Sequence, residues 1–247
     1  PVPRTHRVPS HPSGTRPSRD TGREHHPRPT IRRRHPVSTS GSLHDVRAVV
    51  FDVGETLIDE TRLWTAHARR AGVTPFTLMG LMGALIERGH DHRAAWTILG
   101  IDPPTTFSSI CSEDFYPDAL DCLHQVKDAG LKVGIAGNQP CGTASQVDAL
   151  GITADFIASS ADWNVSKPSA EFFDRVISAA DIGPQRILYV GDRVDNDILP
   201  AQHAGLRTAL IRRGPWGYLH SVLVEAKHAD LRLNSLTELA RIFRGNL

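Results

Sequence analysis

Residues 49–60 read VVFDVGETLIDE, an apolar run that ends at Asp52 and passes into a turn containing Gly54 and Thr56. Apolar runs without alternation are typical of strands that are buried on both faces. The carboxyl end of such a strand is where ligands bind in open α/β sheets. Taken alone, Asp52 is better explained as an ordinary acid at a strand end, so a functional interpretation depends on the other strands.

The same pattern recurs from Val46 onward, where short apolar runs alternate with amphipathic helical stretches. The expected strands are Val46–Asp52, Leu131–Ala136, Asp155–Ala158, Ile187–Gly191 and Thr208–Arg212, with a weaker sixth near Leu231. The helices expected around the later strands are 117–129, 143–150, 169–180, 196–204 and 235–244. This alternation predicts an α/β fold, with a parallel sheet covered by helices on both sides.

One interval interrupts the alternation. Residues 59–112 separate the first two strands and contain only helical patterns, which lie at 64–70, 75–88 and 93–99. A helical insertion of this size after the first strand predicts a cap. The expected organisation is therefore a core of 44–58 and 113–247, a helical cap of 59–112 and a tail of 1–43.

The tail differs in composition from the rest of the chain. Residues 1–43 hold nine Arg, no Lys, eight of the 17 Pro and two acids, a net charge of +7. The remaining 204 residues hold 19 basic and 25 acidic side chains, a net charge of −6. The tail has too few large apolar side chains to offset the entropy lost on ordering, so it is predicted to be disordered. Because this solvated tail is the only strongly basic segment, we do not expect binding of nucleic acid.

The composition also excludes several classes of protein. Three Cys without a C-x-x-C pair indicate neither a disulfide framework nor a zinc site. The longest apolar run, around Ala48–Val53, is far shorter than the roughly 20 residues of a membrane helix. No apolar stretch follows the arginines of the tail, so no secretory signal is expected. We expect a cytoplasmic protein with no membrane segment, and nothing in the composition indicates its oligomeric state.

Acidic side chains follow the fourth expected strand, in the stretch ILYVGDRVDNDILPA of residues 187–201. A helix N-terminus, which favours acids, would explain Asp195 and Asp197 but accounts less well for Asp192. Carboxylates clustered at a strand end repel one another unless a cation compensates them. Hard oxygen ligands of this kind suit Mg²⁺, so the sequence predicts a magnesium site at this edge of the sheet.

Two further segments carry candidate polar groups, and the first of them ends at the same edge of the sheet. The second expected strand ends GIAGNQP, with Gly137 and Asn138, and SSADWNVSKPSAEFF places Lys167 just before Pro168 and a helix. A lone Lys is usually a solvated surface residue. The string GNQPCGT lacks the Lys of a nucleotide-hydrolase phosphate loop, which excludes that class of enzyme.

Together the four segments resemble the haloacid dehalogenase-like (HAD) hydrolase superfamily, over about residues 44–247. The family pattern has a nucleophilic Asp after the first strand, a small hydroxyl residue after the second, a Lys before a later helix and an acidic pair after the fourth strand. The order and strand context agree here. The resemblance implies a HAD-like Rossmannoid fold of three layers with a helical cap, and hydrolysis of a small phosphorylated metabolite.

The resemblance also implies roles for individual residues. Asp52 would be the nucleophile that forms an aspartyl phosphate, and Lys167 would neutralise Asp52 and the phosphoryl oxygens. The implied Mg²⁺ ligands are Asp52, the backbone carbonyl of Gly54, Asp192 and Asp197, the last either as a direct ligand or through a water. A carboxylate that attacks a phosphate dianion meets like charge, which a divalent cation and a lysine cancel at short range.

Two positions depart from the family pattern. Gly54 stands where phosphatases of the family usually have a second Asp that acts as general acid and base. Gly137 stands in the place of the hydroxyl residue, which leaves its backbone N–H, beside Asn138, to bind a phosphoryl oxygen. Missing acid–base help costs about 10²–10⁴ in rate, and most for alkyl phosphates, whose leaving oxygen needs a proton. Glu55, the next residue of the turn, is the candidate substitute, and Gly54→Asp is expected to be as fast or faster on alkyl esters.

These departures leave three functions open. The first is a Mg²⁺-dependent phosphatase, slow or selective for good leaving groups, and this is the function that the residues favour. The second is a carbon–halogen hydrolase, which needs no acid at position 54 but has no use for the acidic pair Asp192 and Asp197. The third is a binding module that keeps affinity for phosphate and metal without turnover.

Substrate contacts are expected from the cap and from the loop after the fifth strand, although the substrate itself is not identified. The cap candidates are Trp64, His67, Arg69, Arg70, His90, His92, Arg93 and Trp96, and the loop candidates are Arg212, Arg213 and Trp216. A solvated surface or packing within the cap explains most of these side chains equally well.

Overall fold

The computed structural model describes residues 43–103 and 108–244. The predicted disordered tail, residues 1–43, lies outside the described residues except for Leu43. This leucine was assigned to the tail by composition, yet it is buried and packs in the main apolar core. The packed part of the chain therefore extends at least one residue into the predicted tail.

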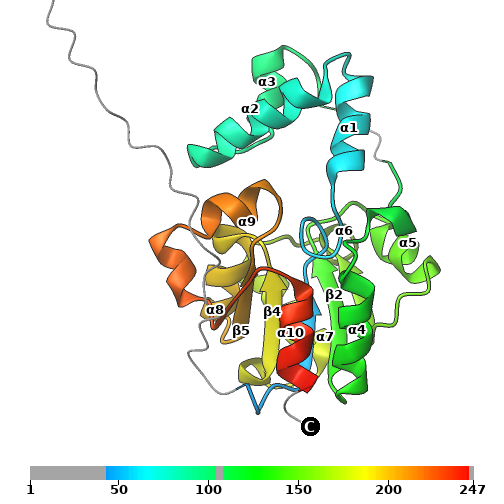
Figure 1. Cartoon of the computed structure of the whole chain (residues 1–247), viewed down its shortest axis with the longest axis vertical. Coiled ribbons are helices and arrows are strands. Elements are labelled where there is room, and N and C mark those ends of the chain that lie inside the picture. The colour runs from blue at the N-terminus through cyan, green and yellow to red at the C-terminus, as the bar shows by residue number, and fades with distance from the viewer. Residues whose placement is uncertain (1–42, 104–107, 245–247) are drawn as a thin grey trace, which may run out of the picture. The chain divides into compact units, whose positions relative to one another are not determined.

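Six parallel strands form the central sheet, in the order β3-β2-β1-β4-β5-β6 (Figure 1). The strands are β1 (Ala48–Phe51), β2 (Lys132–Gly137), β3 (Phe156–Ser159), β4 (Ile187–Gly191), β5 (Arg207–Ile211) and β6 (Leu231–Leu233). In the register, Phe51 of β1 lies beside Ile135 of β2 and Val190 of β4. The residues that follow these three strands are therefore neighbours at one edge of the sheet, and the predicted α/β fold is confirmed.

Helices cover both faces of this sheet (Figure 1). The core helices are α4 (Ala119–Asp128), α5 (Thr143–Ala149), α6 (Ser160–Trp163), α7 (Ala170–Ala180), α8 (Leu199–His203), α9 (Gly214–His220) and α10 (Leu236–Arg244). Helices α4, α5 and α10 pack on one face, and α7 and α8 pack on the other. The short helical turns are η1 (Ser112–Asp114), η2 (Pro184–Arg186), η3 (Val194–Ile198) and η4 (Val224–His228).

This arrangement explains why the strands are apolar throughout. On β1, Val49 and Phe51 belong to the cluster that contains α4 and α10, whereas Ala48 and Val50 belong to the cluster that contains α7. Successive side chains of a strand point to opposite faces, so a strand between two helical layers must be apolar at every position. Of the predicted helices, only 196–204 differs in kind, because its first part is the π-helical turn η3 and only its second part is α8.

Of the helices between β1 and β2, three lie away from the sheet (Figure 1): α1 (Thr61–Arg70), α2 (Pro75–Glu87) and α3 (Ala94–Leu99). They occupy the interval for which only helical patterns were predicted. Their inward side chains form an apolar cluster of their own, which Trp216 of α9 joins. We refer to α1–α3 as the cap. No helix within residues 43–103 and 108–244 has the length and apolar character needed to cross a membrane.

Candidate active site

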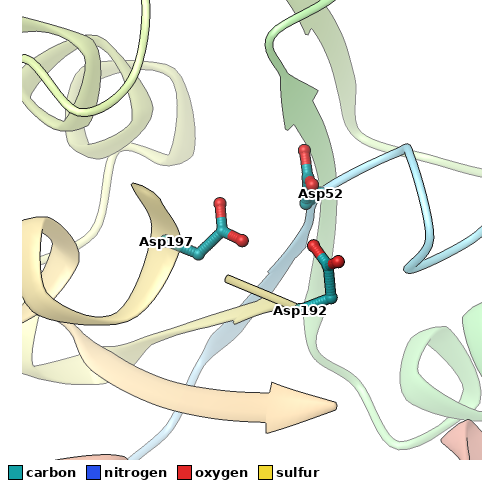
Figure 2. A group of neighbouring side chains, drawn as sticks. All are labelled: Asp52, Asp192 and Asp197. Atoms are coloured by element: carbon teal, nitrogen blue, oxygen red, sulfur yellow. The ribbon is translucent and has the colours of Figure 1, made fainter. Parts of the chain in front are cut away.

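Three acids converge at the edge of the sheet where β1 and β4 end. Asp52 directly follows β1, Asp192 directly follows β4, and Asp197 lies in the turn η3. Figure 2 shows the three carboxyl groups turned toward one another, and one oxygen from each lies within 4.8 Å of the others. All three side chains are buried. Because neighbouring parallel strands end at the same edge, the sheet itself brings these residues together.

Lys167 reaches this acidic cluster from the segment between α6 and α7. Its ammonium nitrogen Nζ lies 2.7 Å from Asp52 Oδ1 and 2.6 Å from Asp197 Oδ1. Burial acts to lower the pKa of Lys167, but the charges of Asp197 and Asp52 outweigh burial and hold this pKa well above its usual value. Lys167 is therefore a cation fixed between two acids.

Asn138, at the end of β2, holds the backbone of Lys167. The amide nitrogen Nδ2 of Asn138 donates to the carbonyl of Lys167 at 2.9 Å, and the N–H of Lys167 donates to Asn138 Oδ1 at 2.8 Å. The side chain of Asn138 is thus committed to positioning the lysine. Only the backbone at the end of β2, and not the side chain of Asn138, is then available to bind a phosphate.

The structure separates Asp197 from its neighbour Asp195. Asp197 is fully buried, and its Oδ2 accepts a hydrogen bond from the N–H of Arg193 at 2.9 Å. A Cβ on Gly191 would lie 2.4 Å from Asp197 Cγ, so the glycine that ends β4 makes room for this carboxylate. Asp195 instead lies outside the cluster, with a side chain that is 59% exposed and an oxygen 2.7 Å from Arg193 Nη2.

The acidic cluster fits a hard divalent cation. Asp192 Oδ2 is buried and has no hydrogen-bond partner among the described residues. Burial raises the pKa of Asp192 well above its usual value, and the charges of Asp197 and Asp52 raise it further. Burial likewise raises the pKa of Asp52 to about 6, a rise that Lys167 opposes and Asp197 increases. A buried carboxylate without a partner, among other acids, is what a bound Mg²⁺ would compensate.

The two glycines that depart from the family pattern both face a carboxylate. A Cβ on Gly137 would lie 2.3 Å from Asp52 Oδ1, and a Cβ on Gly54 would lie 2.6 Å from Glu60 Oε1. Real Cβ atoms do not approach other atoms so closely. In each case a neighbouring carboxylate occupies the space that a side chain at the glycine position would need.

Glu60 is the functional candidate that the sequence did not reveal. It is half-buried, and its Oε2 accepts a hydrogen bond from Trp64 Nε1 at 3.1 Å. Burial raises the pKa of Glu60 to about 7, and the charge of Glu55 adds to the rise. The only signal in the sequence is an acid at the end of the string DVGETLIDE, just before the cap. Nothing local indicates that this acid folds back over Gly54.

Glu55, the predicted substitute for the missing acid, lies in a different environment. It has a positive φ of 51° and a buried side chain. Its Oε2 accepts a hydrogen bond from the Tyr116 hydroxyl at 2.6 Å, and its Oε1 accepts one from the N–H of Glu60 at 3.1 Å. Burial raises the pKa of Glu55, although the hydrogen bond from Tyr116 opposes the rise.

A cavity of about 590 Å³ opens over the acidic cluster, between the sheet edge and the cap. Its floor includes Asp52, Lys167 and Asp192. Five of the predicted substrate contacts line it, namely Trp64, His90, His92, Arg93 and Trp216. Arg193 also lines the cavity, with its guanidinium over the ring of Trp216 at 4.9 Å. A volume of this size suits a small molecule.

Other predicted contacts lie elsewhere. His67 and Trp96 line a neighbouring cavity of about 690 Å³, which Arg69 and Arg70 do not line. Arg213 does not line the cavity over the acidic cluster either. Its guanidinium lies 4.3 Å from the ring centre of Tyr116, and it forms an ion pair with Asp118. Arg213 therefore ties the loop before α9 to the core.

A family model described as haloacid dehalogenase-like hydrolase matches residues 46–205. A glyceraldehyde 3-phosphate phosphatase from Methanopyrus kandleri is 27% identical over 201 residues, which are 69% of this chain and 86% of the relative. One from Methanocaldococcus jannaschii is 31% identical over 132 residues, 52% of this chain and 56% of the relative.

A solved structure of an L-2-haloacid dehalogenase from Xanthobacter autotrophicus matches with a TM-score of 0.61. The match covers 81% of this chain and 99% of that chain at 19% identity. Identity at this level establishes a common fold and leaves the chemistry to the residues of the site.

Proposed function

This chain belongs to the haloacid dehalogenase-like hydrolases, and from that premise we propose that it is a Mg²⁺-dependent phosphatase of a small phosphorylated metabolite. The observation that supports the proposal most strongly is the convergence of Asp52, Asp192 and Asp197 with Lys167 on the floor of one cavity. Asp192 Oδ2, which is buried and lacks a partner, supports a cation at this place. The two phosphatases with which the chain shares 27% and 31% identity support phosphate esters as the substrates.

In the first step, a carboxylate oxygen of Asp52 forms a bond to phosphorus while the bond between phosphorus and the ester oxygen breaks. The leaving oxygen takes up a proton, and the product is an aspartyl phosphate. Lys167 stays within ion-pair distance of Asp52 and reduces the repulsion between this carboxylate and the incoming dianion. The backbone N–H groups at Gly137 and Asn138 are the proposed donors to the phosphoryl oxygens.

In the second step, a water attacks phosphorus and releases inorganic phosphate, which regenerates the Asp52 carboxylate. The proposed Mg²⁺ ligands are Asp52, the Gly54 carbonyl, Asp192 and Asp197. When bound, Mg²⁺ would neutralise charge between the carboxylates and the phosphoryl group. Lys167 and Asp197, 2.6 Å apart, keep the acidic side chains in place through both steps.

The size of the cavity supports a small substrate. About 590 Å³ holds a molecule of metabolite size, and Arg93 and Arg193 are among the lining residues. Glyceraldehyde 3-phosphate, the compound in the names of the two relatives, is the first substrate to test.

We expect wild-type protein to release inorganic phosphate from small phosphate monoesters only when Mg²⁺ is present, and to lose this activity in EDTA. The measurement is phosphate release from a panel of triose, sugar and aryl phosphates. Binding of phosphate without turnover of any ester would instead indicate a binding module. Chloride release from 2-chloropropionate in EDTA would indicate a carbon–halogen hydrolase.

Mg²⁺ should also stabilise the protein, independently of any turnover. A ligand that binds only the folded state raises the Tm, here by about 2–4 °C for a free energy of about 1 kcal/mol. We expect Asp192→Asn to abolish this shift and to raise the Tm of the metal-free protein, because it removes a buried carboxylate that lacks a partner. Asp195→Asn, at the exposed neighbouring acid, should retain the shift. A wild-type Tm that does not respond to Mg²⁺ at constant ionic strength would contradict the metal assignment.

A further inference from the structure

The turn after β1 places a carboxylate opposite the glycine at position 54. A Cβ on Gly54 would lie 2.6 Å from Glu60 Oε1 and 2.9 Å from Glu60 Cδ. The carboxyl group of Glu60 therefore fills the space that a side chain at position 54 would need. Glu60 also lines the same cavity as Asp52 and Lys167, on whose floor the reaction is proposed to occur.

We propose that Glu60 is the general acid and base of this enzyme, in place of the aspartate that position 54 lacks. The inference rests on the proposed phosphatase function. The proton transfer is thereby assigned to Glu60, which lies just before α1 of the cap. The turn after β1 supplies only Gly54 at the position where the family usually has the acid.

Two hydrogen bonds fix Glu60 in this position. Its backbone N–H donates to Glu55 Oε1 at 3.1 Å, and Trp64 Nε1 donates to Glu60 Oε2 at 3.1 Å. Trp64 is four residues further on, one turn into α1, and it lines the same cavity. Because Trp64 engages Oε2, the other oxygen, Oε1, is the one that faces Gly54.

The contacts of Glu55 assign it a different task. Its two carboxyl oxygens accept hydrogen bonds from the Tyr116 hydroxyl and from the N–H of Glu60. A Cβ on Gly214 would lie 2.5 Å from Glu55 Oε2, so this carboxylate is also packed against the start of α9. Glu55 thus shapes the turn from which Glu60 projects, and we regard it as a positioning residue.

The proton transfers balance across the two steps. In the first, the protonated carboxyl group of Glu60 gives its proton to the ester oxygen as the bond from that oxygen to phosphorus breaks, and Glu60 becomes a carboxylate. In the second, this carboxylate takes a proton from the water that attacks the aspartyl phosphate of Asp52. Glu60 then returns to its initial form, and the products are an alcohol and inorganic phosphate.

The test is the dependence of the rate on the leaving group. We expect Glu60→Gln to lower kcat for an alkyl phosphate by about 10²–10⁴-fold, because an alkoxide leaves poorly without a proton. For 2,4-dinitrophenyl phosphate, whose leaving group needs no proton, formation of the aspartyl phosphate in a single turnover should fall by less than about tenfold. Glutamine keeps an oxygen for Trp64 and is close in size. Glu87→Gln, at an exposed acid of α2, is the matched control and should change neither rate.

A rescue variant tests the position as well as the residue. Shortening Glu60 in Glu60→Ala removes the acid, and adding Gly54→Asp then restores a carboxylate to the space that Glu60 had filled. We expect the double variant to recover alkyl phosphate turnover to within about tenfold of wild type. Gly54→Asp alone would push a second carboxylate against Glu60, so the gain expected from the sequence should appear only when Glu60 is shortened.

The possible outcomes separate this inference from the function on which it rests. Equal losses on alkyl and aryl esters in Glu60→Gln, or no loss on either, would overturn the role of Glu60 while wild-type turnover leaves the phosphatase function intact. A leaving-group effect in Glu55→Gln and none in Glu60→Gln would transfer the role to Glu55. A wild-type protein that hydrolyses no phosphate ester overturns the proposed function and this inference together.

Discussion

Asp52→Asn is expected to lower kcat for every phosphate ester by at least about 10⁴-fold, whatever the leaving group. The neutral amide is a poor nucleophile toward phosphorus and would form no aspartyl phosphate. It also removes one of the two anionic partners of Lys167, whose Nζ lies 2.7 Å from Asp52 Oδ1 in wild type. The loss of kcat in Asp52→Asn should therefore be similar for all esters, whereas the loss in Glu60→Gln should depend on the leaving group of the ester.

The measurement for Asp52→Asn combines steady-state kinetics with acid quenching of protein mixed with ³²P-labelled substrate. Wild-type protein should retain label on a peptide that contains Asp52, and the variant should retain none. Asp121→Asn, at an exposed acid of α4, controls for an acid-to-amide change away from the site and should behave as wild type. Turnover by Asp52→Asn near the wild-type rate would mean that another group attacks phosphorus.

Lys167→Met is expected to lower kcat by about 10³-fold and to destabilise the protein by about 3–5 kcal/mol. The variant removes the cation that lies between Asp52 and Asp197, and leaves buried carboxylates with no compensating charge. Breaking a buried ion pair by removing one partner is costly for this reason. Lys127→Met is the matched control, since Lys127 pairs with Asp155 where both side chains are partly exposed, and such surface pairs contribute about 0–1 kcal/mol.

The loss of stability in Lys167→Met should depend on pH in a definite direction. In wild type, the high pKa of Lys167 keeps its charge across the neutral range. In the variant, Asp52, whose pKa is raised by burial and lowered by Lys167, binds a proton more readily in the folded state than in the unfolded state. The stability of the variant is therefore lost as pH rises and recovered as pH falls. The difference in Tm from wild type should be largest near about pH 8 and smaller near about pH 5, and a difference that widens toward acid would contradict this account.

The fold could be predicted from the sequence because its signals are local. A strand that is buried on both faces must be apolar at each position, as β1 and β4 are, and the predicted limits of β4, Ile187–Gly191, are those of the structure. Leu43 shows the limit of composition as a guide. Its neighbours in sequence belong to a segment rich in Pro and Arg, and only packing against the core identifies it as part of the folded chain.

The grouping of the site residues could also be predicted in part from the sequence. Asp52 and Asp192 follow neighbouring parallel strands, which places them at one edge whatever the side chains around them. The different placements of Asp195 and Asp197 could not be predicted from the sequence. Both follow β4 within a few residues, and the π-helical turn η3 with the close approach at Gly191 decides which of them enters the cluster.

By itself, then, the sequence determined the parallel α/β sheet and the edge at which Asp52 and Asp192 meet, because strand burial and the direction of parallel strands follow from local patterns. Only the tertiary structure decided which acid faces Gly54. The direction of the Glu60 side chain depends on where α1 begins, on the indole of Trp64 and on the bond from its backbone to Glu55. These contacts arise only when the turn and the helix pack together, and no residue type or spacing encodes them separately.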